Sequence, residues 1–243
     1  MHLAIDSGNT RTKFALFING KIKEKHAVFN NEASQFLLVY LKKNKEIDKA
    51  ILSCVSSLER VFISTLKSNK VDHLVLTSET KLPIQNHYQT PKTLGKDRIA
   101  MAVGASNFYP NQNMLIISFG SCITYNYIEK GVFVGGAISP GIYQRFEVLN
   151  KKTANLPLLN VKKNSPMIGV NTEQSILSGV LHGAQHEVNG FTQFYHQNRM
   201  LNKVIFTGGD AIYFEGTLKN TTFVHQDIVL KGLKCILDFN QIS

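Results

Sequence analysis

The segment Met1–Phe17, MHLAIDSGNTRTKFALF, indicates the fold of the chain. One apolar run ends at Asp6 and a second begins at Phe14, which predicts two strands joined by a short polar loop. Gly8 lets the loop backbone approach a ligand closely, and an acid at the strand end suits a hydrated Mg²⁺ that bridges phosphates. The side chains that can donate to anionic oxygens are Asn9, Thr10, Arg11 and Lys13. The segment therefore predicts either a phosphate-binding loop or an ordinary polar hairpin.

Length and composition are those of a globular protein. The chain has 243 residues, of which 43% are hydrophobic, and this is enough for one large or two small domains. No apolar run approaches the ~18 residues that span a bilayer, and Asp6 interrupts what would otherwise be a signal segment. The three cysteines form no Cys-x-x-Cys pair. We therefore expect reduced thiols, a cytoplasmic location and no membrane partner.

The formal net charge of +10 raises the question of a nucleic-acid partner. The lysines are scattered over predicted solvated helix faces, and they form no stripe interleaved with aromatic residues. An anionic small substrate accounts for the charge equally well. We expect no nucleic-acid partner.

Strands and helices alternate in the first part of the chain. Asn19-Gly20 predicts a hairpin into a strand over 22–29, and apolar spacing predicts a helix over 32–43. Short buried strands are expected over 50–55 and 73–77, with a helix between them. This alternation implies a mixed sheet with both faces covered.

The opening pattern returns at Met114. An apolar strand, a turn containing Gly120 and an alternating strand follow one another again, and Ser118 falls where the first copy has Asp6. We therefore predict an α/β fold with an internal duplication, in which domains of residues 1–113 and 114–243 hold a nucleotide between them. This arrangement resembles the duplicated actin-like (RNase H-like) domains of the acetate and sugar kinase/actin superfold.

The remainder reads as a glycine-rich link over 135–141, a long amphipathic helix from Asn171 to about Asn198, and a closing helix over 228–239. A buried strand over 204–206 ends in Thr207-Gly-Gly-Asp210. Two adjacent glycines there would let a flat base such as adenine lie on the backbone, or they would form a plain turn. The dinucleotide fingerprint, the P-loop and the eukaryotic kinase signatures are absent from the sequence.

Five passages, taken in order, resemble the type III pantothenate kinase family, which also includes proteins described as Bvg accessory factors. The resemblance covers nearly the whole chain, and Leu-Gly-x-Asp-Arg is its most specific part. The passages are Asp6-Ser-Gly-Asn-Thr-Arg-Thr-Lys13, Thr93-Leu-Gly-Lys-Asp-Arg98, Gly135-Gly-Ala-Ile-Ser-Pro-Gly141, Asn171-Thr-Glu-Gln-Ser-Ile-Leu-Ser-Gly179 and Thr207-Gly-Gly-Asp210.

The resemblance implies an ATP- and Mg²⁺-dependent kinase. Its reaction would transfer the ATP γ-phosphoryl to the primary hydroxyl of pantothenate, giving 4'-phosphopantothenate in the first step of coenzyme A biosynthesis. The family is dimeric, and the segment Ile176–Phe194 is a candidate homodimer interface. Two alternatives remain open: a non-catalytic accessory or regulatory protein that retains the fold, and an actin-like kinase with another small alcohol as acceptor.

The resemblance also implies a role for each matching residue. Asp97 matches the catalytic acid; the positive end of its helix would keep it ionised, and it would take the hydroxyl proton. Asp6 would hold Mg²⁺ through water. Nucleotide-binding positions are Asp6, Ser7, Gly8, Asn9, Thr10, Arg11, Thr12, Lys13 and Ser121. Substrate-binding positions are Tyr88, Gly95, Lys96, Asp97, Arg98 and Thr172. Without the resemblance, Asp97 would be a helix cap, Arg98 a surface cation, and Thr172 or Asn171 a helix N-cap.

Two positions depart from the family pattern, where Ser118 and Asn126 replace acidic residues. The first of these acids is the family's monovalent-cation ligand, so we expect weak or no activation by K⁺ or NH₄⁺. A separate feature is the pair His182 and His186, spaced four residues apart as zinc ligands on a helix would be. The sequence offers no evident third ligand, so we expect ordinary core or surface histidines.

Overall fold

The computed structural model describes residues 1–162, 165–214, 216 and 222–240. Contacts group the chain into two compact units. The first comprises Met1–Pro110, Gly131–Phe133 and the chain from Asp227 onwards, and the second comprises Asn111–Lys130 and Val134–Gln226. This grouping differs from a single cut after residue 113, since the C-terminal helix belongs to the first unit.

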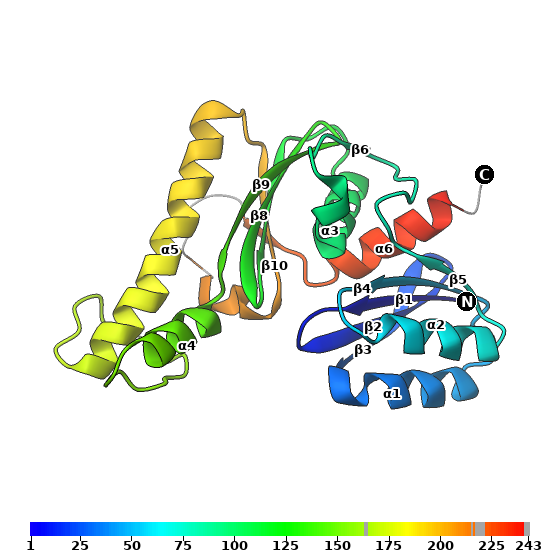
Figure 1. Ribbon diagram of the computed structural model, residues 1–243. Coiled ribbons are helices and arrows are strands. Elements are labelled where there is room, and N and C mark those ends of the chain that lie inside the picture. Colours follow the sequence, from blue (N-terminus) through cyan, green and yellow to red (C-terminus); the bar gives the residue numbers. More distant parts are fainter. Residues whose placement is uncertain (163–164, 215, 217–221, 241–243) are drawn as a thin grey trace. The chain divides into compact units, whose positions relative to one another are not determined.

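Glycines explain why the C-terminal helix joins the first unit. Helix α6 (Ile228–Phe239) packs on α3 (Lys96–Phe108), as Figure 1 shows. A Cβ on Gly232 would lie 1.8 Å from the carbonyl oxygen of Ala100, and one on Gly104 would lie 2.3 Å from that of Ile228. The two backbones can therefore touch only because both positions lack a side chain.

The first unit is built on a five-stranded mixed sheet in the order β3-β2-β1-β4-β5. β1, β2 and β3 are antiparallel, whereas β4 and β5 run parallel to β1. The predicted hairpin is confirmed, because Asn19 and Gly20 both have positive φ, of 49° and 74°. The strands are β1 (His2–Ser7), β2 (Arg11–Ile18), β3 (Lys21–Phe29), β4 (Lys49–Cys54) and β5 (Asp72–Val75).

Helices cover both faces of this sheet, as predicted. In Figure 1, α1 (Asn30–Lys43) and α2 (Glu59–Ser68) lie on one side and α6 on the other. Leu3, Ala4 and Ile5 are consequently at most 1% exposed. A strand buried on both faces reads as a continuous apolar run, which is what the sequence has. The other short elements of this unit are β6 (Gln85–Asn86), which pairs with Val132 and Phe133, and η1 (Pro91–Thr93).

The second unit repeats this topology. Its strands follow the order β11-β10-β7-β8-β9, with β7 antiparallel to β8 and parallel to β10, as β1 is to β2 and β4. The duplication expected from the sequence is therefore present at the level of strand pairing. The strands are β7 (Met114–Phe119), β8 (Cys122–Glu129), β9 (Val132–Pro140), β10 (Lys203–Thr207) and β11 (Thr222–Val224).

The predicted glycine-rich link over 135–141 is wrong. Strand β9 continues to Pro140, and helix α4 (Ile142–Lys152), which the sequence analysis did not predict, follows. A Cβ on Gly136, where φ is +152°, would lie 1.7 Å from the carbonyl oxygen of Tyr125. The glycine thus permits close approach of β8 within a sheet, not a flexible connection.

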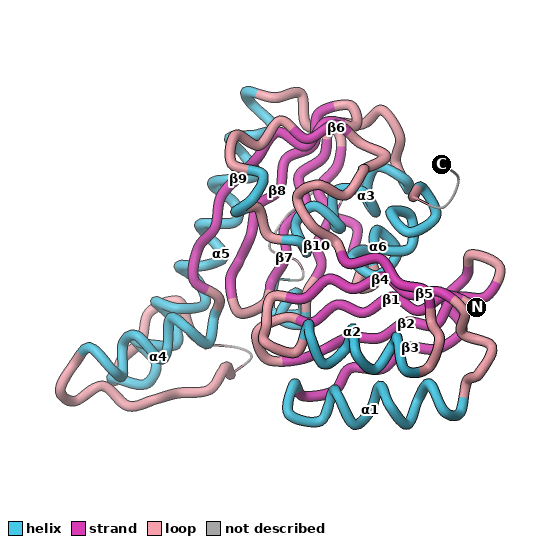
Figure 2. The backbone as a smooth tube through the Cα atoms, turned by 45° about the vertical axis from the view of Figure 1, so that its right-hand side comes forward, coloured by secondary structure: helices cyan, strands magenta, loops and turns pink. Residues whose placement is uncertain are grey.

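Long helix α5 (Thr172–Asn198) is confirmed, and α4 lies beside its N-terminal half (Figure 2). Both helices share a core with β7 and β8 that includes Phe119, Tyr125, Phe146 and Val180. A short η2 (Gly209–Phe214) follows β10. Within the described ranges, no helix has the length and apolar character that crossing a membrane requires.

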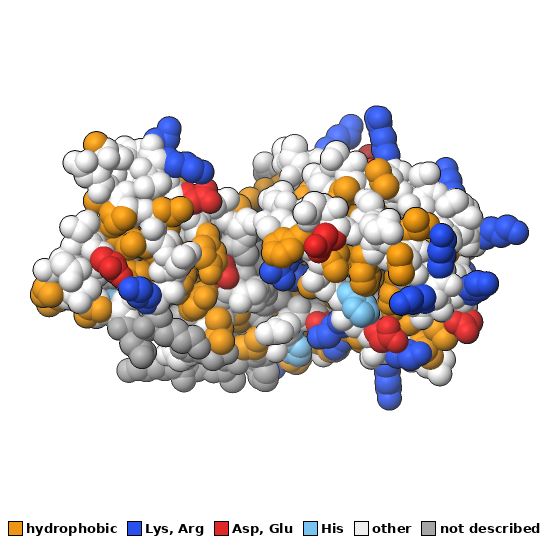
Figure 3. Space-filling model, turned by 90° about the horizontal axis from the view of Figure 1, so that it is seen from below, with side chains coloured by type: hydrophobic (Ala, Val, Ile, Leu, Met, Phe, Trp, Pro, Cys, Tyr) orange, Lys and Arg blue, Asp and Glu red, His pale blue; other side chains and the backbone are white. Residues whose placement is uncertain are grey.

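Surface charge is dispersed. In Figure 3, Lys and Arg side chains are spread over the visible face of the first unit and are separated by uncharged and apolar atoms. They form no continuous basic stripe on that face. The absence of a nucleic-acid partner stays a prediction.

Candidate active site

The turn between β1 and β2, Gly8–Arg11, is called the phosphate loop below. The N–H of Gly8 donates to the carbonyl of Arg11 at 3.1 Å, which closes the turn. Asp6 pairs across the strands with Lys13, and Ser7 pairs with Thr12. The strand–loop–strand form predicted for this segment is confirmed, and it puts an acid and a lysine at the same level beside the loop.

The loop side chains differ in their surroundings. Asn9, Thr10 and Arg11 are exposed, whereas Ser7 and Thr12 are at most 1% exposed. The Arg11 guanidinium lies 4.4 Å from the centroid of the Phe29 ring, a cation–π contact that leaves the cation at the surface. The exposed donors on the loop are available to bind an anion. The buried hydroxyls lie beneath the loop.

Asp6 is held in an environment that disfavours its charge. Burial raises its pKa to about 6, and the negative charge of Asp97 is the next largest cause. Lys13 and a hydrogen bond from the hydroxyl of Ser53, at 3.3 Å, act in the opposite direction. The Asp97 carboxylate on α3 therefore lies near enough to Asp6 on β1 to raise its pKa. The positive charge of Lys13 lowers the pKa of both acids.

Asp97 lies in the first turn of α3, after the N-cap residue Gly95. A Cβ on Gly95 would lie 2.6 Å from Oδ1 of Asp97, so the glycine leaves room for the carboxylate to fold back over the helix start. Burial raises the pKa of Asp97, although the N–H and the guanidinium of Arg98 oppose it. Burial is thus the largest influence on the pKa of Asp97, and the N–H groups at the start of the helix act against it.

The side chain of Lys96 forms a salt bridge with Glu59. Its ammonium lies 2.9 Å from the Glu59 carboxylate and donates to the carbonyl of Cys54 at 3.1 Å. This contact ties the start of α3 to α2 and to the end of β4. The side chain of Lys96 therefore anchors the helix that carries Asp97.

Arg98 is 4% exposed, so the alternative of a surface cation is wrong. Its guanidinium carbon lies 5.6 Å from the ring centroid of Tyr88 and 5.7 Å from that of Phe133. The two rings also contact each other, with centroids 6.0 Å apart. The structure thus brings Tyr88 and Arg98 together, as the sequence motif implied, and adds Phe133 to them.

In the second unit, Ser118 has the topological place of Asp6. It pairs with Thr124 on β8 and with Thr207 on β10, as Asp6 pairs with Lys13 and Ser53. The adjacent turn is closed by the N–H of Gly120 to the carbonyl of Cys122 at 3.1 Å, and Ser121 is exposed on it. Where the first unit has an acid and a lysine, this unit has three hydroxyl-bearing residues.

Asn126 is completely buried inside the β7–β8 pair. Its Nδ2 donates to the Thr124 hydroxyl at 3.1 Å and to the carbonyl of Ile116 at 3.3 Å. An aspartate would lose both donations. The departure from the family's acidic residue therefore has a structural role here.

Asn171, not Thr172, caps helix α5, because its Oδ1 accepts from the N–H of Gln174 at 2.9 Å. Thr172 is exposed and lines a groove of about 750 Å³ between α4 and α5, together with Arg145 and Ser175. Its hydroxyl thus borders a groove, as a ligand-contacting residue would.

Two adjacent glycines follow β10. Gly208 has φ of +94°, and a Cβ there would lie 2.1 Å from the carbonyl oxygen of Phe119. A Cβ on Gly209 would meet nothing within 4 Å. Gly208 is therefore needed for close packing, and Gly209 leaves open space of the kind that a flat ligand could use.

His182 has local partners for both ring nitrogens. Nδ1 lies 3.1 Å from Oε1 of Gln185, and Nε2 lies 3.0 Å from the carbonyl oxygen of Ser165. Among the described residues, no group of three potential ligands surrounds a metal position.

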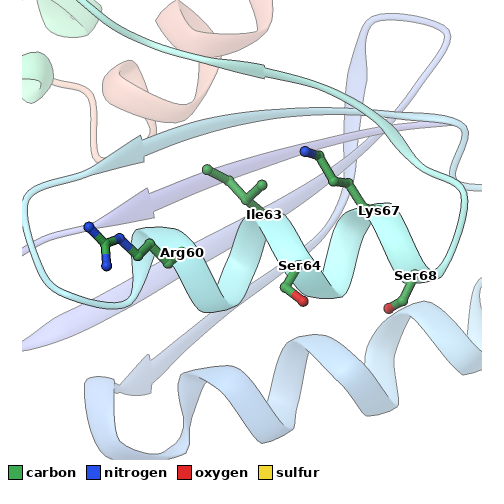
Figure 4. A pocket seen from close by; sticks show the side chains of 5 residues that line it. All are labelled: Arg60, Ile63, Ser64, Lys67 and Ser68. Atoms are coloured by element: carbon green, nitrogen blue, oxygen red, sulfur yellow. The ribbon is translucent and has the colours of Figure 1, made fainter.

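A separate shallow groove of about 590 Å³ runs along α2. Figure 4 shows Ser64 and Ser68 pointing toward α1 and Ile63 and Lys67 pointing the other way. It lacks the residues predicted for the site, so the groove adds nothing to it.

A model of the family "Type III pantothenate kinase" matches residues 2–193. The chain belongs to the type III pantothenate kinase family. A type III pantothenate kinase of Christiangramia forsetii is 43% identical over 242 residues, which are 99% of either chain. One from Flavobacterium johnsoniae is 39% identical over 96% of either chain.

Solved structures confirm the duplicated actin-like fold of this kinase. A putative Baf family transcriptional activator from Campylobacter jejuni has a TM-score of 0.68 at 19% identity and covers 99% of this chain and 100% of its own. MreB5 of Spiroplasma citri bound to ADP has a TM-score of 0.52 at 12% identity, covering 99% and 97%. At such identities these likenesses concern the fold alone.

Three residues of this kinase contact the site or its supports and were not predicted from the sequence. Phe133 contacts the Tyr88 ring and the Arg98 guanidinium, and Asn30 contacts the phosphate loop. Glu187 on α5 accepts hydrogen bonds from Arg145 and Tyr125, at 2.6 and 2.8 Å, and so fixes α4 and β8 to α5. Asn30 had one usable signal, as an asparagine two residues before the helix predicted over 32–43.

Proposed function

We propose that the chain transfers the γ-phosphoryl group of ATP to the primary hydroxyl of pantothenate, forming 4'-phosphopantothenate in the cytoplasm. Membership of the family supports this reaction. The observation that carries it is the shared neighbourhood of Asp6, Asp97 and Lys13 next to the phosphate loop. Phosphoryl transfer depends chiefly on positioning and on neutralising charge, and these are the elements that such a neighbourhood supplies.

The acidic pair also fits a divalent metal. Asp6 sits close to a second carboxylate with its pKa raised, and a cation would relieve that unfavourable charge. Asp6 would hold Mg²⁺, directly or through water, and the ion would supply charge neutralisation to the ATP phosphates. Ser7–Lys13 are the proposed nucleotide-binding residues of the first unit, and Ser121 is the one proposed for the second.

Asp97 is assigned the proton transfer. As the acceptor hydroxyl oxygen bonds to the γ-phosphorus and the bond to ADP breaks, the hydroxyl proton passes to the Asp97 carboxylate. Its raised pKa suits this task, since a carboxylate with a higher pKa holds a proton more readily. Tyr88, Arg98 and the backbone of Gly95–Lys96 would orient the acceptor, and Thr172 remains a further proposed substrate-binding residue.

We further propose a homodimer through the second unit. Several apolar side chains on α4 and on the segment before α5 are more than half exposed. Burying exposed apolar side chains is a usual reason for association. The members are Val148, Leu158, Met167, Ile168 and Val170. Light scattering on a sizing column tests this, and a monomer at micromolar concentration would contradict it.

The activity is tested by coupled detection of ADP with pantothenate and a panel of small alcohols as acceptors. The product is then identified by mass as 4'-phosphopantothenate. Turnover with another alcohol but not with pantothenate would indicate a different acceptor. Absence of turnover with all of them would favour an accessory protein.

A further inference from the structure

Asn30, the first residue of α1, contacts the phosphate loop at several points. Its Nδ2 donates to the carbonyl of Gly8 at 2.9 Å and to that of Asn9 at 3.1 Å. Its backbone N–H donates to the carbonyl of Thr10 at 3.2 Å, and its Oδ1 accepts from the hydroxyl of Thr12 at 2.9 Å. One residue of a helix thus contacts the whole turn between β1 and β2.

The carbonyls of Gly8 and Asn9 fix the orientation of the Asn30 amide. The Thr12 hydroxyl has one proton, which goes to Oδ1 of Asn30, so the Ser7 hydroxyl donates to Thr12 across 3.0 Å. A flipped amide would place its oxygen against the carbonyl oxygens of Gly8 and Asn9. Because that arrangement sets acceptors against acceptors, the amide nitrogen must face the loop.

The contacts of Asn30 orient the carbonyls of the phosphate loop. The carbonyls of Gly8, Asn9 and Thr10 accept from Asn30, and that of Arg11 accepts from the N–H of Gly8. A carbonyl oxygen carries partial negative charge and repels phosphate oxygens. A loop that binds ATP must keep these oxygens engaged elsewhere, and Asn30 engages three of the four.

We propose that Asn30 is a positioning residue for the nucleotide: it sets the phosphate loop in its binding conformation before ATP arrives. The proposal rests on the proposed function in that the loop is taken to bind ATP. The second unit supports its turn differently, through the N–H of Gly141, which donates to the carbonyl of Ser121 at 3.0 Å. Loss of Asn30 should therefore affect the phosphate loop selectively.

The test compares Asn30→Ala with Asn44→Ala. Asn44 follows the other end of α1, and its Nδ2 donates to the carbonyl of Tyr40 at 3.0 Å, so it is a matched control for helix stability. We expect Asn30→Ala to raise both KM for MgATP and Kd for MgADP about 10-fold or more, the effect of losing two or more hydrogen bonds. KM for pantothenate should stay within about twofold of the parent value in both variants. Asn44→Ala should leave nucleotide affinity unchanged.

Two further variants distinguish the effect of losing the Asn30 N–H donors from the effect of making the side chain smaller. Asn30→Asp keeps the size and the acceptor for Thr12 but loses both N–H donors, so it should bind MgADP no better than Asn30→Ala. Asn30→Ser should fall between Asn30→Ala and the parent. If Asn30→Ala does not fold by circular dichroism, Asn30→Ser is compared with Asn44→Ala in its place.

Parental MgADP affinity in a folded Asn30 variant would overturn the proposal, and so would an equal loss in Asn44→Ala. Binding of MgADP by titration calorimetry needs no acceptor. A parent protein that binds MgADP but leaves pantothenate unphosphorylated would therefore contradict the proposed function, while the role of Asn30 would still be decided by the binding data.

Discussion

The negative charge of Asp97, in the first turn of α3, raises the pKa of Asp6 at the end of β1. These two acids come from segments far apart in the sequence, and only folding of the first unit brings them together. Asp6 and Asp97 are proposed to have different tasks, metal binding for Asp6 and proton transfer for Asp97. The tasks can be separated by experiment.

Replacing Asp97 should impair the chemical step. We expect Asp97→Asn to lower kcat by about 10²–10⁴-fold, the usual cost of removing a general base, while KM for MgATP changes little. Steady-state kinetics with both substrates varied will measure this. Asp72→Asn is the control, because Asp72 is an exposed acid on β5 of the same unit. Near-parental turnover in Asp97→Asn would show that Asp97 is only an acid of the first helical turn, without a role in proton transfer.

Gly95 should matter through the position of the Asp97 carboxylate. A Cβ there would lie 2.6 Å from Oδ1 of Asp97, so Gly95→Ala must push the carboxylate aside. A displacement of this order at a reacting group can cost about 10²-fold in rate, and we expect kcat to fall by about that amount. Stopped assays at saturating substrates will show it. If Gly95→Ala turns over at the parental rate, the carboxylate is not in its reactive position in this structure.

The raised pKa of Asp6 predicts a pH-dependent stability in metal-free buffer. An acid whose pKa is about 6 in the folded state and 3.8 otherwise makes the native state bind more protons between these values. Stability therefore falls as the pH rises from about 4 to about 6, and the cost persists above that window. Asp6→Asn removes the cost and should gain about 1–3 kcal/mol at pH 7.5, with little gain at pH 4.

Urea unfolding with EDTA at both pH values measures that difference, and Asp72→Asn again serves as the control. A variant whose stability relative to the parent does not change between pH 4 and pH 7.5 would show that Asp6 ionises normally.

The sequence predicted the local elements of the site well, because their signals are local. Two apolar runs around a polar loop specified the first pair of strands, and Asn19-Gly20 specified the hairpin into the third. The supports of the site could not be predicted in this way. Asn30 acts through carbonyls on another element, and Phe133 reaches Arg98 only through tertiary packing.

Glycines produced the clearest error. Gly135 and Gly136 indicated a glycine-rich link, whereas Gly136 lies in a strand where the backbone of Tyr125 comes too close for a Cβ. The residues around Gly136 do not indicate that the backbone of Tyr125 lies beside it. A glycine required for close packing therefore reads the same as one required for a turn.

Ser118 predicts a weak response to monovalent cations. It replaces an acid, and its strand neighbours Thr124 and Thr207 are neutral, so a bound K⁺ would lack an anionic ligand to offset its dehydration. Turnover should change little when K⁺ or NH₄⁺ is added at constant ionic strength to a buffer free of both. Ser118→Asp is the matched variant and should create a response. Strong saturable activation of the parent protein by K⁺ would mean that other oxygens complete the site.

The most direct measurement follows the γ-phosphoryl group itself. ATP labelled with ³²P at the γ-position is incubated with pantothenate, Mg²⁺ and the parent, Asp97→Asn or Asp72→Asn protein, and the products are separated by chromatography. The account predicts that label appears in 4'-phosphopantothenate with the parent and Asp72→Asn proteins and falls by at least about 10²-fold with Asp97→Asn. Label released only as inorganic phosphate, or labelled 4'-phosphopantothenate formed equally fast by Asp97→Asn, would contradict it.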